Sequence, residues 1–330
     1  MTHTRSLLAW LGWTYILLIA LWLLLRLVFF DQLWWLALVN TVAEYLFVPL
    51  PALLAATLWR RAWRLLLGLS LPAIAFGALF GALFLPRPTE RSADRAPVIT
   101  AMTFNVLTSN KDAAAIVGAI RAARPDIVGF QELTHARKTA ISAALAADYP
   151  YHTLLPPERF PGVGLLSRFP IERVERFPLP PLDYALHAVL RVDGVRLDVF
   201  VVHLSPNGFG RNPIDQYAAL ARERYAQRAA EVARLGQELH AVRGPALLLC
   251  DCNLTDTSQA YAQLATFLLD SFREVGWGFG HSSFGQRAPY LAQRIDYVWH
   301  TEGLVALEAV VGPDGGSDHR PVVTRLALRR

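Results

Sequence analysis

The sequence predicts an α/β (α+β) protein with two layered sheets, preceded by an N-terminal region of transmembrane helices. Apolar residues crowd into the first 86 of 330 positions, where charges are few. Beyond them, many short strand-like apolar runs alternate with a few Ala-rich helical runs. That mixture favours two layered sheets over a single parallel doubly wound sheet.

The N-terminal region contains three apolar segments. Ser6–Leu25 has 20 uncharged residues, enough for a helix to cross a hydrocarbon core of about 30 Å. A cleaved signal peptide would have a shorter apolar stretch and a small-residue cleavage site. Leu33–Trp59, interrupted by Glu44 and two prolines, and Leu65–Leu85 are the other segments. We predict a membrane region over residues 1–86 with about three transmembrane helices, and expect Glu44 to snorkel or to lie protonated between helices.

Short-loop arginines predict the orientation of this region. Arg60, Arg61 and Arg64 lie between the second and third segments and are typical of a cytoplasmic loop. Arg5 places the N-terminus on the same side, so three spans would put the downstream domain outside the cytoplasm. We therefore predict an integral protein of the plasma or inner membrane whose downstream domain is extracytoplasmic. Two or four spans would reverse that side.

The downstream region reads as a linker followed by one domain. Residues 87–96 are rich in proline and charge and are the predicted linker, and residues 97–330 are the predicted domain. The strands and helices that we predict are, in order, Val98–Asn105, the helix Ala113–Ala123, Asp126–Phe130, the helix Ala136–Ala147, Val163–Ser167, Ala188–Val192, Leu197–Leu204, the helix Gln216–Val242, Ala246–Cys250, Ile295–Trp299 and Val322–Ala327.

Charge and cysteine content narrow the functional classes. Residues 1–96 contain eight Arg and four acidic residues, which leaves 24 basic and 23 acidic residues in 97–330. Duplex DNA binding usually requires a basic surface, so a near-neutral domain makes nucleic acid the less favoured partner. Cys250 and Cys252 are the two cysteines. At that spacing on a strand they would share one face and rarely bond, so we expect no dependence on disulfides.

Polar residues follow several of the apolar strands, where their side chains can converge on one rim. The segments are TFNVL with Asn105, IVGFQEL with Glu132, GLLSRFP with Arg168, VVHLSP with His203, LLLCDCN with Asp251 and Asn253, RIDYV with Asp296, and SDHRPV with Asp318 and His319. Their order and context resemble the endonuclease/exonuclease/phosphatase (DNase I-like) superfamily over nearly all of 97–330, in a membrane-anchored bacterial form. The resemblance implies a four-layered two-sheet sandwich flanked by helices, and metal-dependent hydrolysis of phosphoric esters.

Glu132 is the strongest candidate metal ligand, because an acid at the end of an apolar strand is not ordinary core. Mg²⁺ prefers oxygen ligands from one or two carboxylates. The resemblance implies that Asn105 assists metal or phosphate binding and that Asp318 adds a carboxylate. We expect Mg²⁺ as the cofactor, with Mn²⁺ as the alternative, and the sequence leaves one or two metals open.

Asp251 and Asn253 would point the same way in an extended segment. The carboxylate could then orient or deprotonate water while the amide donates to a phosphoryl oxygen. The alternative is an Asx turn that ends the strand. The resemblance implies that His319 contacts phosphate or handles a proton, that Asp296 fixes its tautomer, and that His203 contacts the scissile phosphate.

Other polar residues lack such a context. We expect Arg168 and Arg294 to form structural salt bridges. The remaining histidines, read as ordinary loop or surface residues, are His135, His187, His240, His281 and His300.

The sequence therefore favours a membrane-anchored, metal-dependent phosphoesterase or phosphatase whose partners are the lipid bilayer and a phosphate-containing substrate, for which a lipid-linked phosphate is one candidate. A membrane-tethered endo/exonuclease is the alternative enzyme, and a non-catalytic binding module is the alternative of another class. Loss of a metal or base residue would indicate that module, and every expected position is filled. Substrate identity and oligomeric state do not follow from the sequence.

Overall fold

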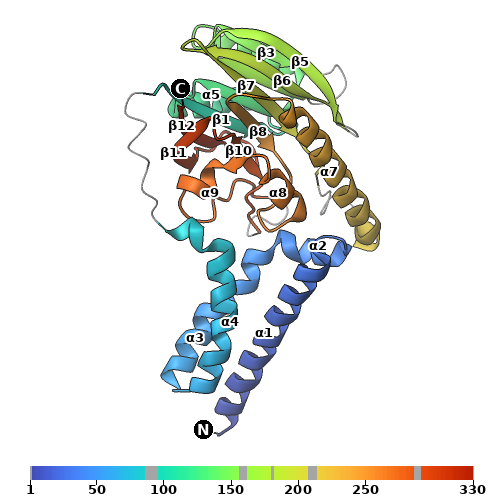
Figure 1. Cartoon of the computed structure of the whole chain (residues 1–330), viewed down its shortest axis with the longest axis vertical. Coiled ribbons are helices and arrows are strands. Elements are labelled where there is room, and N and C mark those ends of the chain that lie inside the picture. Colours follow the sequence, from blue (N-terminus) through green and yellow to red (C-terminus); the bar gives the residue numbers. More distant parts are fainter. Residues whose placement is uncertain are drawn as a thin grey trace.

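The computed structural model describes residues 2–85, 96–155, 162–179, 182–206, 214–285 and 291–329. A helical stalk carries an α/β domain at one end (Figure 1). The predicted linker, residues 87–96, lies outside the described residues except for Ala96. The stalk contains α1 (Thr2–Phe29), α2 (Trp34–Thr41), η1 (Ala43–Phe47), α3 (Pro49–Trp59), α4 (Trp63–Phe80) and η2 (Gly81–Phe84).

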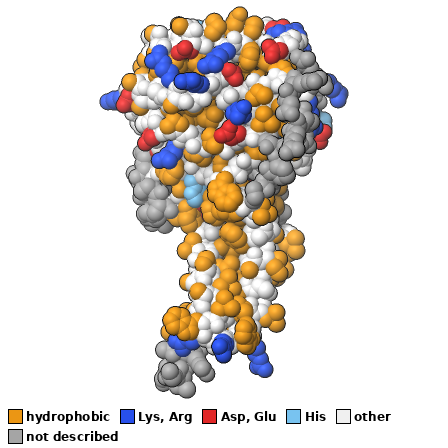
Figure 2. Space-filling view, turned by 90° about the vertical axis from the view of Figure 1, so that its left-hand side faces the viewer, with side chains coloured by type: hydrophobic (Ala, Val, Ile, Leu, Met, Phe, Trp, Pro, Cys, Tyr) orange, Lys and Arg blue, Asp and Glu red, His pale blue; other side chains and the backbone are white. Residues whose placement is uncertain are grey.

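Among the described residues, two helical segments of the stalk, Leu7–Phe29 and Trp63–Phe84, are long and apolar enough to cross a membrane. The count rises to three if the bent pair Trp34–Thr41 and Ala43–Trp59 is one span. In Figure 1 the chain rises along α1, returns along α3 and rises again along α4. The stalk surface in Figure 2 is largely apolar, with basic side chains at the foot far from the α/β domain.

The second predicted span, Leu33–Trp59, is divided into α2, η1 and α3. It bends by 71° between α2 and the rest, and α3 begins with Pro49, which lacks the N–H that would continue a preceding helix. Eleven residues of α3 extend only about 17 Å at 1.5 Å per residue. Glu44 does not lie between stalk helices either, since its carboxylate pairs with His281 of the α/β domain.

The α/β domain contains two mixed six-stranded sheets. One has the order β11-β12-β1-β2-β4-β3 and consists of β1 (Val98–Asn105), β2 (Ile127–Leu133), β3 (Tyr151–Leu155), β4 (Gly162–Ser167), β11 (Leu304–Val311) and β12 (Val322–Leu328). The other has the order β5-β6-β7-β8-β10-β9 and consists of β5 (Ile171–Leu179), β6 (Leu182–Val192), β7 (Val195–His203), β8 (Ala246–Asp251), β9 (Leu269–Asp270) and β10 (Asp296–His300).

Helices cover the outer faces of both sheets. The domain's helices are α5 (Ala113–Ala123), α6 (His135–Leu145), η4 (Ile214–Gln216), α7 (Tyr217–His240), α8 (Gln259–Leu264) and α9 (Ser271–Val275). One buried apolar cluster joins the inner faces of the two sheets. A second joins the β1 sheet to α5 and α6, and a third joins the β8 sheet to α7 and α8. The α/β prediction and its four-layered two-sheet sandwich are therefore confirmed.

Strand pairing brings the polar strand ends together. Most pairs are antiparallel, but β1–β2 and β7–β8 are parallel, so each pair ends at the same edge of its sheet. Asn105 is in register with Gln131, and His203 is in register with Asp251. Asp251 is also opposite Asp296, where β10 begins as β8 ends. The inner faces of the sandwich then place these two edges side by side.

Candidate active site

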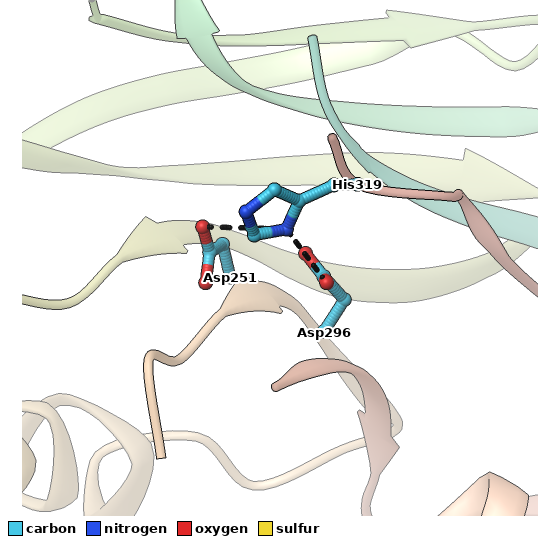
Figure 3. A group of neighbouring side chains, drawn as sticks. All are labelled: Asp251, Asp296 and His319. Carbon is cyan, nitrogen blue, oxygen red and sulfur yellow. Dashed lines mark hydrogen bonds and ion pairs between the residues drawn. The ribbon is translucent and has the colours of Figure 1, made fainter. Parts of the chain in front are cut away.

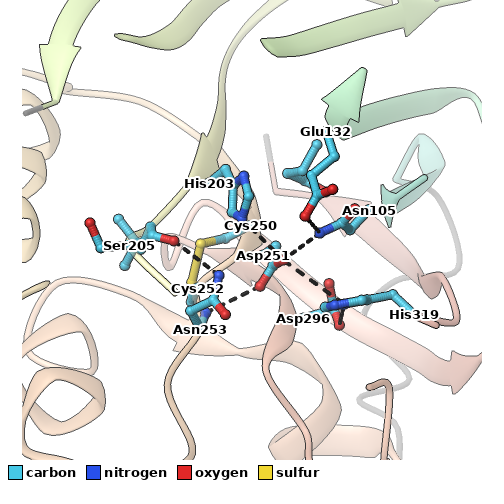
Figure 4. Close-up of polar contacts among 12 residues, drawn as sticks. Asn105, Glu132, His203, Ser205, Cys250, Asp251, Cys252, Asn253, Asp296 and His319 are labelled. Atoms are coloured by element: carbon cyan, nitrogen blue, oxygen red, sulfur yellow. Dashed lines mark hydrogen bonds and ion pairs between the residues drawn. A yellow bond between two sulfur atoms is a disulfide. The ribbon is translucent and has the colours of Figure 1, made fainter. Parts of the chain in front are cut away.

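Side chains from both sheets meet at this shared edge (Figure 4). Asn105, at the end of β1, links the sheets because its Nδ2 donates to Glu132 Oε1 at 3.2 Å and to Asp251 Oδ2 at 2.7 Å. Asn105 and Asp251 are both 1% exposed. A buried amide that joins carboxylates from two sheets is a polar network that fixes their relative position.

Glu132 is held in an ionised state. Its backbone is left-handed at φ 56°, an uncommon conformation for a side-chain-bearing residue. Thr108 donates to Glu132 Oε2 from its backbone nitrogen at 2.7 Å and from Oγ1 at 2.6 Å. Burial acts to raise the pKa of Glu132, but the electrostatic interaction with His203 and the hydrogen bonds from Thr108 and Asn105 prevail and lower this pKa to about 2.

Asp251 and Asn253 adopt the turn alternative rather than an extended segment. The strand ends at Asp251, and the Asn253 backbone nitrogen donates to Asp251 Oδ1 at 3.2 Å, with Asn253 at φ 49°. The Asn253 amide donates to the carbonyl of Leu204 at 2.9 Å. Asp251 therefore faces the site, where His203 Nε2 lies 3.4 Å from its Oδ2, while the Asn253 side chain fastens the neighbouring β7 loop.

The expectation that the cysteines stay unbonded is wrong, because Cys250 and Cys252 form a disulfide (Figure 4). The prediction assumed an extended strand, which would separate the two Cα atoms by about 6.6 Å at 3.3 Å per residue. The turn after β8 shortens that separation to 5.1 Å, inside the usual range for disulfides. The covalent ring encloses Asp251.

His319 lies beside two aspartates (Figure 3). Its Nδ1 is 2.9 Å from Asp296 Oδ2 and 3.9 Å from Asp251 Oδ2. Burial acts to lower the pKa of His319, but the charges of Asp296, Asp251 and Asp318 outweigh it and raise the pKa to about 10. Burial and the nearby Asp296 raise the pKa of Asp251. An imidazolium beside a carboxylate of raised pKa is an acid next to a base.

The donor set fits a divalent cation. Carboxylates outnumber imidazoles in the site, which is unfavourable for an anionic phosphate without a counter-charge. Two carboxylate oxygens, Asp296 Oδ1 and Asp318 Oδ1, are buried without a hydrogen-bonding partner among the described residues. Asp251, Asp296 and His319 also offer ligand atoms within 4.8 Å of one another. Asp296 already engages His319 Nδ1, whereas Mg²⁺ prefers oxygen ligands.

The structure adds site residues that the sequence did not indicate. Ser282 Oγ donates to Asp296 Oδ2 at 2.7 Å, and Thr108 holds Glu132. Ser282 precedes Asp296 by a loop and follows no strand, so no local pattern marks it. Thr108 follows Asn105 by three residues, and a polar run after a strand was the signal available for it.

The remaining predicted residues lie outside this network. Arg168 pairs with Asp126, and buried Arg294 pairs with Asp256 and Asp270, as expected of structural salt bridges. Three histidines expected to be ordinary are instead paired with carboxylates. They are His187 with Asp198, His281 with Glu44 and His300 with Glu274.

Solved structures share this fold at low sequence identity. An endonuclease/exonuclease/phosphatase from Beutenbergia cavernae is 23% identical with a TM-score of 0.56, covering 71% of this chain and 72% of that one. Sphingomyelinase C from Streptomyces griseocarneus is 20% identical with a TM-score of 0.52, covering 69% and 99%. A mannosyl-6-phosphatase from Bacteroides thetaiotaomicron is 17% identical with a TM-score of 0.54, covering 70% and 100%.

Sequence comparison agrees with the fold. No curated protein matches the chain significantly. The model of the Endonuclease/Exonuclease/phosphatase family matches residues 102–319, well over half of the chain and nearly the whole α/β domain. That range begins in β1 and ends at His319, so it contains every residue of the network above. The chain belongs to the Endonuclease/Exonuclease/phosphatase family.

Proposed function

We propose that this protein is a membrane-tethered, divalent-metal-dependent phosphoesterase that hydrolyses a phosphate ester or pyrophosphate by in-line attack of water. The observation that carries the proposal is the convergence of Asn105, Glu132, Asp251, Asp296 and His319 from both sheets. Members of this family hydrolyse phosphoesters, which supports the reaction class.

Glu132, Asn105 and Asp318 would hold the metal, Mg²⁺ or Mn²⁺. Such an ion, when bound, neutralises charge on the phosphoryl oxygens. The low pKa of Glu132 keeps a carboxylate available at neutral pH, and the orphaned Asp318 Oδ1 offers a further oxygen.

Asp251 and His319 would handle the protons. Asp251 would orient the attacking water and accept its proton, since burial has raised its pKa. His319 would donate to the leaving oxygen, because the surrounding aspartates keep its imidazole protonated. Asp296 orients the ring through Nδ1, and His203 would contact the phosphate beside Asp251.

We further propose that α1 and α4 anchor the domain in the plasma or inner membrane, with the active site outside the cytoplasm. The apolar character of both helices supports the anchor. The basic foot of the stalk, opposite the α/β domain, supports the orientation. Tethering raises the local concentration of lipid substrates, so we favour a lipid-linked phosphate, such as a phospholipid headgroup or a polyprenyl pyrophosphate.

The test uses the full chain in detergent and in vesicles, with Mg²⁺ or Mn²⁺ supplied or chelated. The substrates are a polyprenyl pyrophosphate, phospholipids, sphingomyelin, inositol phosphates, and single- and double-stranded DNA. Metal-dependent turnover should fall at least ~100-fold in Glu132→Gln and His319→Ala. Glu308→Gln, at an exposed side chain of β11 away from the site, is the matched control.

Preference for a lipid over DNA would support the lipid-linked substrate, whereas preference for DNA would favour the tethered nuclease. Folded protein that turns over none of these substrates and binds neither metal would overturn the catalytic proposal in favour of a binding module.

A further inference from the structure

The bend of the stalk, residues 30–48, makes direct hydrogen bonds to the loops that carry the active site. The carbonyl of Asn40 accepts from Thr257 Oγ1, in the loop after Asp251 and Asn253. Tyr45 donates to the carbonyl of Ala292 at 2.8 Å, in the segment that leads to Asp296. The stalk therefore touches the approaches to both aspartates.

One of these contacts joins two ionisable side chains, Glu44 of the bend and His281 of the α/β domain. Glu44 Oε1 lies 2.8 Å from His281 Nε2, with the two side chains 18% and 27% exposed. The His281 ring also stacks on the Phe279 ring, with 5.5 Å between the ring centroids and 4° between the ring planes. Phe279 in turn packs edge-on against Phe80 of α4 and Phe84 of η2. The stalk thus determines where the His281 ring lies.

His281 begins a short segment that reaches the catalytic histidine by two routes. By side chain, the next residue, Ser282, donates to Asp296 Oδ2, which contacts His319 Nδ1 at 2.9 Å. By backbone, the carbonyl of Ser282 accepts from Arg320 at 2.7 Å, and Phe284 donates to the carbonyl of Asp318 at 2.9 Å. A displacement of residues 281–284 would therefore move Asp296 and the His319 turn together.

We propose that Glu44 and His281 are positioning residues that couple the stalk to the Asp296–His319 pair, so that the stalk is part of the active-site support as well as an anchor. This inference rests on the proposed phosphoesterase function. Glu44, the acid inside an otherwise apolar segment, thereby has a role in the active site. Neither Glu44 nor His281 contacts substrate, so both act through other residues. Small misplacements of reacting groups lower rates steeply, so the pair should act on turnover.

The kinetic test uses full-length protein in detergent and bis(p-nitrophenyl) phosphate, a soluble probe that removes any effect of membrane concentration. Glu44→Ala and His281→Phe, which keeps the ring on Phe279, should each lower kcat about 10- to 100-fold. KM and the Mg²⁺ concentration for half-activity should stay within about threefold of wild type, as expected of positioning. Glu44→Gln keeps the shape and a hydrogen bond, and should restore most of the activity.

A second measurement does not depend on activity. Hydrogen exchange should quicken in Glu44→Ala at residues 281–285 and 291–296, and stay unchanged in β5 and β6, which lie far from the contact. Glu308→Ala on β11 should change neither kcat nor exchange in these segments.

The outcomes separate the two proposals. If the wild-type protein shows no metal-dependent turnover on any substrate, the proposed phosphoesterase function is wrong. The hydrogen-exchange measurement then decides whether the coupling exists. If the wild type is active but the kcat values of Glu44→Ala and His281→Phe stay within twofold of it, the coupling alone is wrong. Unchanged hydrogen exchange at residues 281–285 and 291–296 would also overturn the coupling alone. The coupling is also wrong if kcat falls only in proportion to the amount of folded protein.

Discussion

The protonation of His319 depends strongly on its carboxylate neighbours. Its pKa is raised to about 10 by Asp296, Asp251 and Asp318 against the opposing effect of burial. Because the folded pKa exceeds the unfolded value of about 6.5, the charged imidazole stabilises the fold fully below pH 6.5. That contribution is lost as pH rises towards 10.

This linkage gives a pH-dependent prediction. In chelator, to exclude metal effects, His319→Asn should lower the melting temperature most at pH 6. The difference in melting temperature between this variant and wild type should then narrow steadily between pH 7 and pH 10. Thermal unfolding in one detergent across that range is the measurement, with Glu308→Gln as the control. A difference in melting temperature that stays constant with pH would show that the neighbouring aspartates do not keep His319 protonated.

Glu132 behaves in the opposite sense. With a folded pKa of about 2 and an unfolded value near 4.3, its ionised form stabilises the fold above pH 4.3, and this contribution is lost as pH falls towards 2. Metal-free Glu132→Gln should therefore lose stability relative to wild type at pH 6 and approach it at pH 3. Chemical denaturation at pH 6 and pH 3 would measure the difference in free energy of unfolding between the variant and wild type. An equal difference at both pH values would contradict the low pKa of Glu132.

At the scale of elements, the sequence predicted the central strands and missed the edges. The boundaries of β1 and α5 agree with prediction, and α5 starts where Asp112 caps it by accepting from the Ala115 nitrogen. The strands left unpredicted are β3, β5, β9 and β11, which are the outer strands of the two described sheets. An edge strand is only partly covered, so its residues need not be apolar.

The same limit applies to the site. Asn105, Glu132, His203, Asp251 and Asp296 each begin or end a strand, or lie next to a strand end, so the sequence could mark them. Pairings across long sequence distances leave no such local mark, as in the contact of Glu44 with His281 across 237 positions. The turn at Asn253 was the alternative that the sequence left open, and the disulfide was missed because the prediction assumed an extended segment after Cys250.

Packing between the sheets gives an element-scale prediction. A Cβ on Gly129 of β2 would lie 2.8 Å from Leu249 Cβ of β8 and 3.3 Å from Val201 Cγ1 of β7. Gly129→Ala should therefore destabilise the fold by about 1–3 kcal/mol, as overpacking does. The matched control is Gly118→Ala in α5, where nothing lies within 4 Å and helix propensity favours Ala by about 1 kcal/mol. Denaturant melts of both variants would test this, and equal stabilities would refute close packing at Gly129.

Helix α7 supports the turn after β8. Arg228, 2% exposed, donates to the carbonyl of Asn253. Arg228→Met leaves the buried carbonyl of Asn253 without its donor, which typically costs about 1–3 kcal/mol, so this variant should destabilise the fold and lower activity. Exposed Arg222, on the same helix, gives the control Arg222→Met, which should lie within about 0.5 kcal/mol of wild type. Similar melts for the two variants would show that Arg228 does not hold the turn.

At the scale of the whole molecule, the helical stalk and the α/β domain form one connected structure. The stalk bend contacts α7 through Thr41 and Tyr225, whose hydroxyls lie 2.7 Å apart. It also contacts the loops around Asp251 and Asp296. The α/β domain would therefore keep a fixed orientation relative to a bilayer around the stalk, which matters more for a lipid-linked phosphate than for a soluble one.

The bond between Cys250 and Cys252 makes the proposed orientation open to thiol chemistry. Disulfides persist in oxidising compartments and are rare in the reducing cytosol. If the domain faces outwards, protein denatured directly from cells should react with a maleimide only after reduction. Two reactive thiols without reductant would contradict both the bond and the outward placement. A short covalent ring around Asp251 would thus record, in each molecule, the side of the membrane on which its active site folded.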